Sequence, residues 1–164
     1  MAGDLPAKIY LMATPSSGKS YFANGNQYFR GVRVIDFSVL RLERREAGDY
    51  HRKVHRFLQD YDSPVCLLGR RGPKDLTDFD GVTLGVVLPS MEDHLKFVAA
   101  RAAEHRRDID RWADEENILE ARKRLAKYAK KRKLPVFTSF REAAEALIPE
   151  EQIPERDSDH AASE

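Results

Sequence analysis

A short segment near the N-terminus combines the residue types that bind phosphate. Directly after the apolar run of residues 9–12, the chain reads Ala13, Thr14, Pro15, Ser16, Ser17, Gly18, Lys19 and Ser20. This is the pattern of a phosphate-binding loop, with Ala13 where such loops usually have glycine. Backbone N–H groups would surround an anion, Lys19 would reach the β- and γ-phosphates of a nucleotide, and the Ser20 hydroxyl would ligate Mg²⁺. The alternative is a Ser/Gly-rich turn that holds no ligand.

A carboxylate at the end of another apolar run is the second candidate for chemistry. Asp36 follows Val34 and Ile35. Ligands of open parallel sheets bind beyond the carboxyl ends of the strands, so we expect Asp36 and the loop at the same edge. There the carboxylate could take the proton from an attacking hydroxyl or hold a metal through water. The alternative role is an N-cap of the following helix.

Arginines follow the third and fourth apolar runs. Arg70 and Arg71 could grip an acceptor phosphate, or be solvated loop residues. No acid stands at this position, where many nucleotide-hydrolysing proteins have a Mg²⁺-binding aspartate, and this argues against a mechanical ATPase or GTPase. Arg101 and Arg107 lie where a helical lid could bring arginines onto a transferring phosphate, although a spacing of six places them poorly on one helix face. For each of them, a solvated helix face is the alternative.

Composition bounds the class of protein. A chain of 164 residues with a formal net charge of +1 is the size of one domain and is no polycation as a whole. Residues 30–74 nevertheless sum to +5, which suits an anionic partner, and residues 142–164 sum to −7. The single cysteine, Cys66, excludes an internal disulfide and is expected to be a buried strand residue. No membrane span or signal peptide is expected, and the predicted compartment is the cytoplasm.

A basic stretch between the second and third apolar runs could position a nucleotide or a nucleic-acid strand. Its Arg and Lys residues, beginning at Arg41, would contact phosphates without reading sequence, unless they simply form a wet helix face. Tyr50 is the best candidate to stack on a base, whereas Phe57 is expected in the core.

Strands and helices alternate along the chain. Strands are predicted at residues 8–13, 33–37, 64–69, 82–89 and 135–138, and helices at 18–24, 39–61 (broken near Gly48), from 90 onward, 117–133 and after 139. The apolar faces of the later helices are expected to include the following residues: Leu95, Val98, Ala99 and Ala102, then Ile118, Leu119, Ala121, Leu125 and Tyr128. Ser90 with Asp93, and Ser139 with Glu142, read as capping boxes. The pattern predicts an α/β, three-layer domain over residues 1–149 around a parallel sheet, with a disordered acidic tail at 150–164.

Together these features resemble the small P-loop kinases of the nucleoside, nucleotide and polynucleotide kinase group. The resemblance covers about residues 7–148 and rests mainly on the loop, with Asp36, the arginine-bearing lid and the closing unit at 134–143 in support. It implies a P-loop NTPase fold with a parallel five-stranded sheet in the order 2-3-1-4-5 and a helical lid. It also implies ATP and Mg²⁺ as cofactors and γ-phosphoryl transfer. In polynucleotide kinases the aspartate after the second strand is the base, which maps to Asp36, and a nearby arginine maps imperfectly to Arg41.

Three functions remain open from the sequence. The chain is also similar to bacteriophage kinases that phosphorylate 5-hydroxymethyluracil in DNA, and this resemblance implies a DNA acceptor. A deoxynucleoside monophosphate kinase would instead need Arg41 or Arg70 to clamp the α-phosphate of a single nucleotide. A non-catalytic ATP-binding partner protein would bind the nucleotide and transfer nothing.

Overall fold

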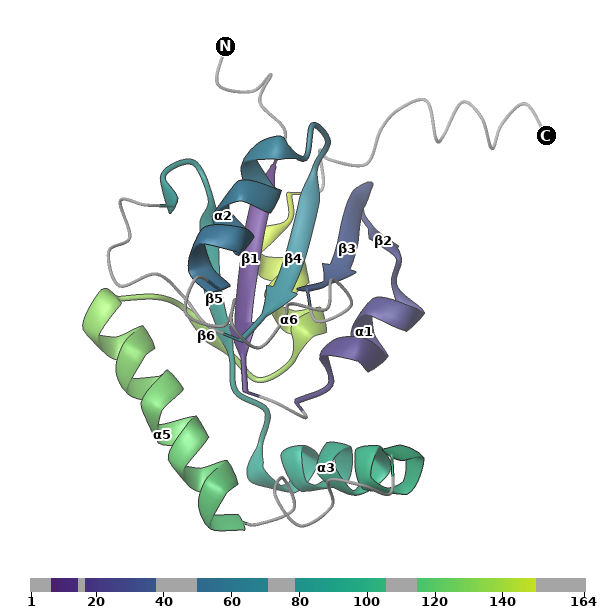
Figure 1. Cartoon of the computed structure of the whole chain (residues 1–164), viewed down its shortest axis with the longest axis vertical. Helices are drawn as coiled ribbons and strands as arrows, with labels where there is room; N and C mark the ends of the chain where they lie inside the picture. The colour runs from purple at the N-terminus through teal and green to yellow at the C-terminus, as the bar shows by residue number, and fades with distance from the viewer. Residues whose placement is uncertain (1–6, 15–16, 38–49, 71–78, 106–114, 150–164) are drawn as a thin grey trace, which may run out of the picture.

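A computed structural model describes residues 7–14, 17–37, 50–70, 79–105 and 115–149. These residues form one six-stranded, mostly parallel sheet with helices on both faces (Figure 1). The strands are β1 (Lys8–Ala13), β2 (Tyr28–Phe29), β3 (Val32–Asp36), β4 (Val65–Gly69), β5 (Thr83–Val87) and β6 (Val136–Phe137). Their order across the sheet is β2-β3-β4-β1-β5-β6. The predicted α/β class with alternating strands and helices is thus confirmed. The predicted tail at 150–164 lies outside the described residues.

The five parallel strands have the expected order. Numbered along the chain without β2, they run 2-3-1-4-5, with β1 at the centre between β4 and β5. The expectation of five strands is wrong in one respect, because β2 adds a sixth, antiparallel strand beside β3. Arg30 and Gly31 join the two strands, and both have positive φ angles, 50° and 80°. A two-residue turn with this geometry matches the twist of a hairpin, so β2 forms where the sequence showed only an irregular stretch.

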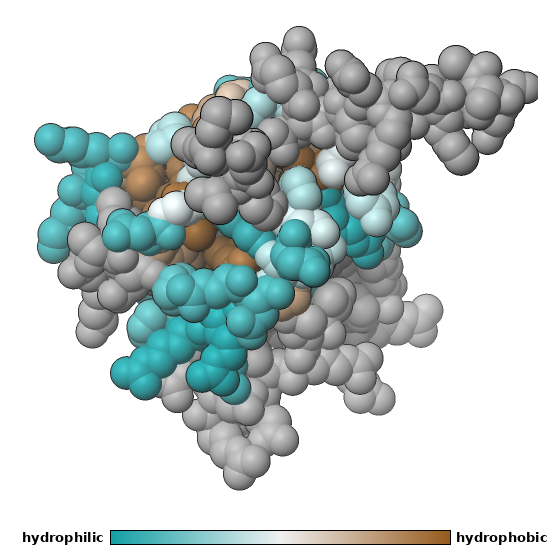
Figure 2. Space-filling view, turned by 90° about the horizontal axis from the view of Figure 1, so that it is seen from above, coloured by the Kyte–Doolittle hydropathy of each residue, from teal (hydrophilic) through white to brown (hydrophobic). Residues whose placement is uncertain are grey.

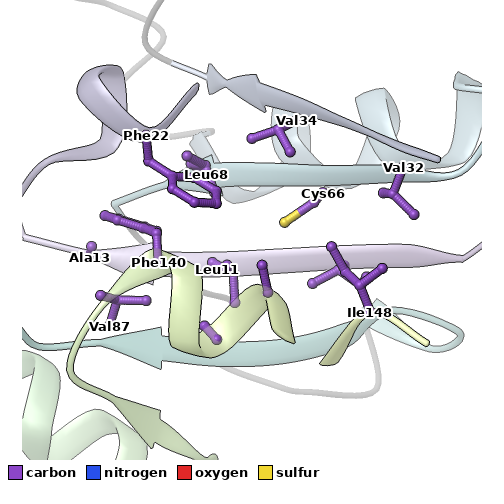
Figure 3. Packing of buried hydrophobic residues seen from close by; sticks show 13 residues of the cluster. Leu11, Ala13, Phe22, Val32, Val34, Cys66, Leu68, Val87, Phe140 and Ile148 are labelled. Atoms are coloured by element: carbon purple, nitrogen blue, oxygen red, sulfur yellow. The ribbon is translucent and has the colours of Figure 1, made fainter. Parts of the chain in front are cut away.

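The central strands are buried on both faces because their side chains alternate between two apolar clusters. Ile9, Leu11 and Ala13 of β1 point into one cluster, whereas Tyr10 and Met12 point into the other. The first cluster is covered by α1 (Lys19–Gly25) and α6 (Phe140–Leu147), as Figure 3 shows for its Phe22 and Phe140. The second is covered by α2 (Tyr50–Asp60) and α5 (Glu115–Arg132). This is the predicted three-layer arrangement.

Cys66 lies in the first cluster, between β3 and β1 in the sheet (Figure 3). Its side chain is fully buried, and this burial raises the pKa of its thiol to about 12. The prediction of a buried strand cysteine is confirmed.

α3 (Met91–His105) and α6 each begin after a serine cap. Ser139 is the N-cap of α6, and its hydroxyl accepts a hydrogen bond from the Glu142 N–H at 3.0 Å. The Glu142 carboxylate reaches one residue further back than in a standard capping box, since it accepts from the N–H and hydroxyl of Thr138. The Ser90 hydroxyl accepts from the Asp93 N–H at the start of α3, which confirms the second predicted cap.

The predicted apolar faces of the long helices are partly wrong. Val98 of α3 and Ile118 and Leu125 of α5 are buried as expected, but Leu95 is 38 % exposed and Leu119 is 40 % exposed. Ala99 is exposed as well. The reason for α3 is its position: it lies across the end of the sheet rather than on a face (Figure 1) and turns His94 and Phe97 toward the chain that follows β1. No helix in the described part of the chain is long and apolar enough to cross a membrane.

Candidate functional site

The buried polar side chains of the described residues gather at the carboxyl end of the sheet. They are Thr14, Ser17, Lys19, Asp36 and His94, and we call these five residues the polar edge. Thr14, Ser17 and Lys19 follow β1, and Asp36 is the last residue of β3. His94 lies in the first turn of α3, the helix that follows β5. A buried polar group costs stability unless it is hydrogen-bonded, so this concentration marks the edge as the candidate site. Figure 2 looks onto the opposite end, where the parallel strands begin, and there hydrophobic side chains lie among hydrophilic ones.

The segment after β1 folds back on its own carbonyl. The backbone carbonyl oxygen of Thr14 accepts hydrogen bonds from the Ser17 hydroxyl and, at 2.9 Å, from Lys19 Nζ. Lys19 is only 8 % exposed, so its ammonium lies inside the loop rather than in solvent. An ammonium held there, beside the N-terminus of α1, gives the loop a positive interior suited to an anion.

Gly18 is required at the start of α1 for two reasons. Its φ of 97° lies in the left-handed region, where a side chain is strained. A Cβ added there would also stand 2.8 Å from the Phe97 ring of α3. α3 can therefore lie this close to residue 18 only because that residue has no side chain.

His94 is a buried residue of the candidate site that the sequence analysis did not single out. It is 1 % exposed, and its Nε2 lies 3.4 Å from the Thr14 hydroxyl, while its Nδ1 lies 3.2 Å from Arg122 Nη1 of α5. Arginine has only donors, so Nδ1 is the acceptor and the ring proton is on Nε2, facing Thr14. Partial burial also lowers the pKa of the Arg122 guanidinium. His94 follows the Ser90 cap by four residues. Its partners Thr14 and Arg122 are 80 and 28 positions away in the sequence, so no local pattern indicates these contacts.

Asp36 lies at the expected edge. It is 5 % exposed and is the last residue of β3, in register with Leu68 of β4, which is itself in register with Leu11 of β1. At about 4.8 Å between neighbouring strands, Asp36 lies about 10 Å across the sheet from β1. A transferred group could fit between the carboxylate and the loop. The predicted alternative, an N-cap, concerns a helix start within 38–49, which lies outside the described residues.

Arg70 directly follows β4, the strand between β3, which Asp36 ends, and β1. Its guanidinium carbon lies 5.7 Å from the centre of the Tyr50 ring, and its backbone N–H donates to Tyr50 Oη at 3.0 Å. The side chain is exposed at the same edge, as a residue that contacts an acceptor must be. Tyr50 itself is buried in the second cluster, so its predicted role as a stacking platform is wrong. Phe57 packs against that cluster, as expected.

The end of β4 has no room for a larger residue than glycine. A Cβ at Gly69 would collide with the hydroxyl of Tyr10 on β1. The acid that many nucleotide-hydrolysing proteins have after this strand is absent from residues 69 and 70, and the next residues, 71–78, lie outside the described part.

The structure places the remaining predicted site residues only in part. Pro15, Ser16, Arg41 and Arg107 lie outside the described residues. Ser20 belongs to α1 and Arg101 to α3, but their side chains are not among those described. Ala13 ends β1 and is buried, with Val87 of β5 as its register partner. Within the described ranges, no three His, Cys, Asp or Glu side chains cluster in a way that could hold a metal ion.

The comparisons with known proteins assign no family to this chain. No protein-family model matches the sequence. A search of curated proteins also gave no match. The functional argument therefore rests on the residues and their geometry.

Proposed function

We propose that this protein is an ATP-dependent kinase with a P-loop NTPase fold that transfers the γ-phosphoryl group to a hydroxyl of a nucleic-acid or nucleotide acceptor. The observation that carries the proposal is the polar edge, where a buried lysine bonded to the Thr14 carbonyl lies two strands from a buried carboxylate, together with the exposed Arg70 that follows the strand between them. The strand order 2-3-1-4-5, with the loop after the central strand, supports it.

The residues fit ATP in the following way. Residues 13–20 would surround the triphosphate with backbone N–H groups, and Lys19 would exchange its hydrogen bond to the Thr14 carbonyl for the phosphates. Mg²⁺ would neutralise phosphate charge and would be held by the Ser20 hydroxyl, whose position after Lys19 fits this role. Charge developing on the transferred group would be stabilised by Lys19 and by arginines such as Arg70.

The proton of the acceptor goes to Asp36. As the hydroxyl oxygen forms its bond to the γ-phosphorus, the bond to the β-phosphate oxygen breaks, ADP leaves, and the carboxylate takes the hydroxyl proton. For the acceptor we propose a hydroxyl on a base in DNA, with 5-hydroxymethyluracil as the specific candidate. Its support is the sequence resemblance and the basic charge of residues 30–74.

Labelled ATP tests the proposal. The protein, Mg²⁺ and γ-labelled ATP are incubated with a duplex containing 5-hydroxymethyluracil, with an unmodified duplex and with free deoxynucleoside monophosphates, and the nucleosides are then analysed by mass spectrometry. We expect label on the modified duplex. Label on monophosphates alone would contradict the DNA acceptor. ATP binding with no product on any acceptor would leave a nucleotide-binding protein and contradict the kinase.

Two substitutions separate binding from chemistry. Asp36→Asn should lower kcat by about 10²–10⁴-fold while ATP still binds, because the base is lost and the shape is kept. Lys19→Ala should weaken both ATP binding and turnover. The matched controls are Asp60→Asn and Lys96→Ala, which change exposed residues of α2 and α3 by the same charge. Equal turnover in Asp36→Asn and Asp60→Asn would contradict the role of Asp36.

A further inference from the structure

α5 and the residue after it contain a dense run of positive charge. Residues 121–133 contain eight Lys or Arg and no acid, so they contribute +8 to a chain whose total is +1, and all other residues together sum to −7. Five exposed cations lie on the helix itself, and we call them the α5 stripe: Lys123, Arg124, Lys127, Lys130 and Lys131.

Helix geometry places the stripe on one side. At 100° per residue, Lys123, Lys127 and Lys130 lie within about 60° of one another, and Arg124 and Lys131 lie beside them. Leu125 and Ala129, which pack into the second cluster, project from the opposite side. The stripe therefore faces away from the core. Its nine residues extend about 12 Å along the helix axis, which equals the spacing of three to four phosphates on one strand of a duplex.

Within the part of the chain that the structure describes, no carboxylate neutralises the stripe. On α3, Glu92 pairs with Lys96, and on α6, Arg141 pairs with Glu145, each four residues apart. None of the five stripe residues forms an ion pair with a carboxylate within the described ranges. The pairs Lys123–Lys127 and Lys127–Lys131 instead set like charges four residues apart, which destabilises a helix.

The helix dipole accounts for only part of this charge. It favours cations in the last turn, where Lys130 and Lys131 stand. Lys123, Arg124 and Lys127 lie further from the C-terminus, beyond the reach of this effect. A charge arrangement that costs local stability favours the binding of an anionic partner.

We propose that the α5 stripe binds the phosphate backbone of a nucleic acid and holds it against the kinase domain. The inference rests on the proposed function. It adds the surface that would hold a nucleic-acid acceptor, which a free nucleotide would not need. α2 covers the same face of the sheet, and its exposed Arg52 and Arg56 add positive charge to this layer. The stripe starts one residue after Arg122, which joins the candidate site through His94.

An anionic membrane fits the stripe less well. A helix that binds at a lipid surface buries an apolar face in the membrane as well as presenting cations. Here the apolar residues Ile118, Leu125 and Ala129 are turned into the protein. Leu119 is the large apolar side chain of α5 that is exposed among the described residues, and it precedes the stripe by one turn.

Salt dependence of DNA binding tests the stripe directly. The affinity of the full chain for a fluorescent duplex is measured between 50 and 200 mM salt, without ATP, for the unchanged protein and for the double variant Lys127→Gln/Lys130→Gln. We expect the slope of log K against log salt to become about 2 units less steep, because each lost phosphate contact removes about 0.9. The matched control Lys96→Gln/Arg141→Gln removes the same charge from exposed positions of α3 and α6 and should keep the slope. Glutamine is a good helix former, so α5 should remain folded, which circular dichroism verifies.

The outcomes separate this inference from the kinase proposal. Equal slopes for the stripe variant and the control would overturn the inference, and so would loss of binding to phosphatidylserine vesicles with unchanged DNA binding. If the stripe variant loses DNA affinity while no acceptor is phosphorylated by the unchanged protein, the kinase fails and the nucleic-acid surface stands. If phosphoryl transfer to the duplex occurs with the same KM in the stripe variant, the kinase stands and the stripe fails.

Discussion

The polar edge and the two faces of the sheet bury opposite kinds of side chain. The faces are packed with aliphatic and aromatic residues that stabilise the fold by leaving water. The polar edge buries a lysine, an aspartate and a histidine, each of which loses hydration on folding. The edge lies where the carboxyl ends of the same parallel strands meet the following segments, so the contrast favours a role in stability for the faces and a role in binding and chemistry for the edge.

The largest effect on stability is expected from the faces. Leu68 of β4 is fully buried in the first cluster, so Leu68→Ala should lower the free energy of unfolding by about 2–5 kcal/mol. Urea denaturation measures this loss. Leu119→Ala, at an exposed position of α5, is the matched control and should cost less than about 1 kcal/mol. If Asp36→Asn lowers the free energy of unfolding as much as Leu68→Ala does, the proposed difference between the polar edge and the sheet faces is contradicted.

A double-mutant cycle tests whether the histidine of the polar edge acts through the loop. Thr14→Val removes the hydroxyl that accepts from His94, and His94→Ala removes the donor. Because each change breaks the same hydrogen bond, we expect a coupling free energy of about 0.5–3 kcal/mol, in ATP binding as well as in unfolding. Isothermal titration with ATP and urea denaturation measure both. Additive effects would show that His94 merely fills space. His94→Gln, which keeps an N–H donor, should restore part of the ATP affinity.

The close approach of α3 to the loop predicts a smaller loss at Gly18. Gly18→Ala should lower the free energy of unfolding by about 1–2 kcal/mol through its left-handed backbone, with a further loss from the clash with Phe97. Phe97→Leu in the same chain should recover only the part due to the clash. Gly25→Ala is the control, because Gly25 has open space around it and should tolerate a Cβ. Equal stability of the two alanine variants would contradict the geometry at residue 18.

At neutral pH the smallest effect concerns the pKa of Cys66, because its thiol is protonated there in both the folded and the unfolded state. Its folded pKa of about 12 lies above the ordinary value of 9.0, so the unfolded state releases the thiol proton first as pH rises. The contribution of this thiol to stability is complete below about pH 9 and is lost progressively between pH 9 and 12. The free energy of unfolding should therefore fall more over this range in the unchanged protein than in Cys66→Ala. Thiol-reactive reagents at pH 8 should label the folded protein far more slowly than the urea-unfolded one, and rapid labelling of the folded protein would contradict the burial.

Local patterns predicted the parts of the fold that depend on neighbouring residues. The five parallel strands, the short helix after the loop and the caps at Ser90 and Ser139 were all found, because alternation and capping act within a few positions. β2 was missed, although the Arg30–Gly31 pair between Phe29 and Val32 was its signal. Tyr50 was misread because an aromatic residue among cations suits both a core and a stacking site, and only packing against Phe37 and Arg70 decides between them.

The sequence by itself determined the loop after β1, the carboxylate after β3 and the charge of α5, because residue type and spacing are local properties. Only the tertiary structure decided that Lys19 and Asp36 are buried at one edge, that His94 joins Thr14 to Arg122, and that the five stripe residues face away from the core. The physical reason is that burial and hydrogen-bond partners depend on which elements pack together. The apolar spacing within one helix does not show which elements pack together. It therefore predicted that Leu95 and Leu119 are buried, although both are exposed.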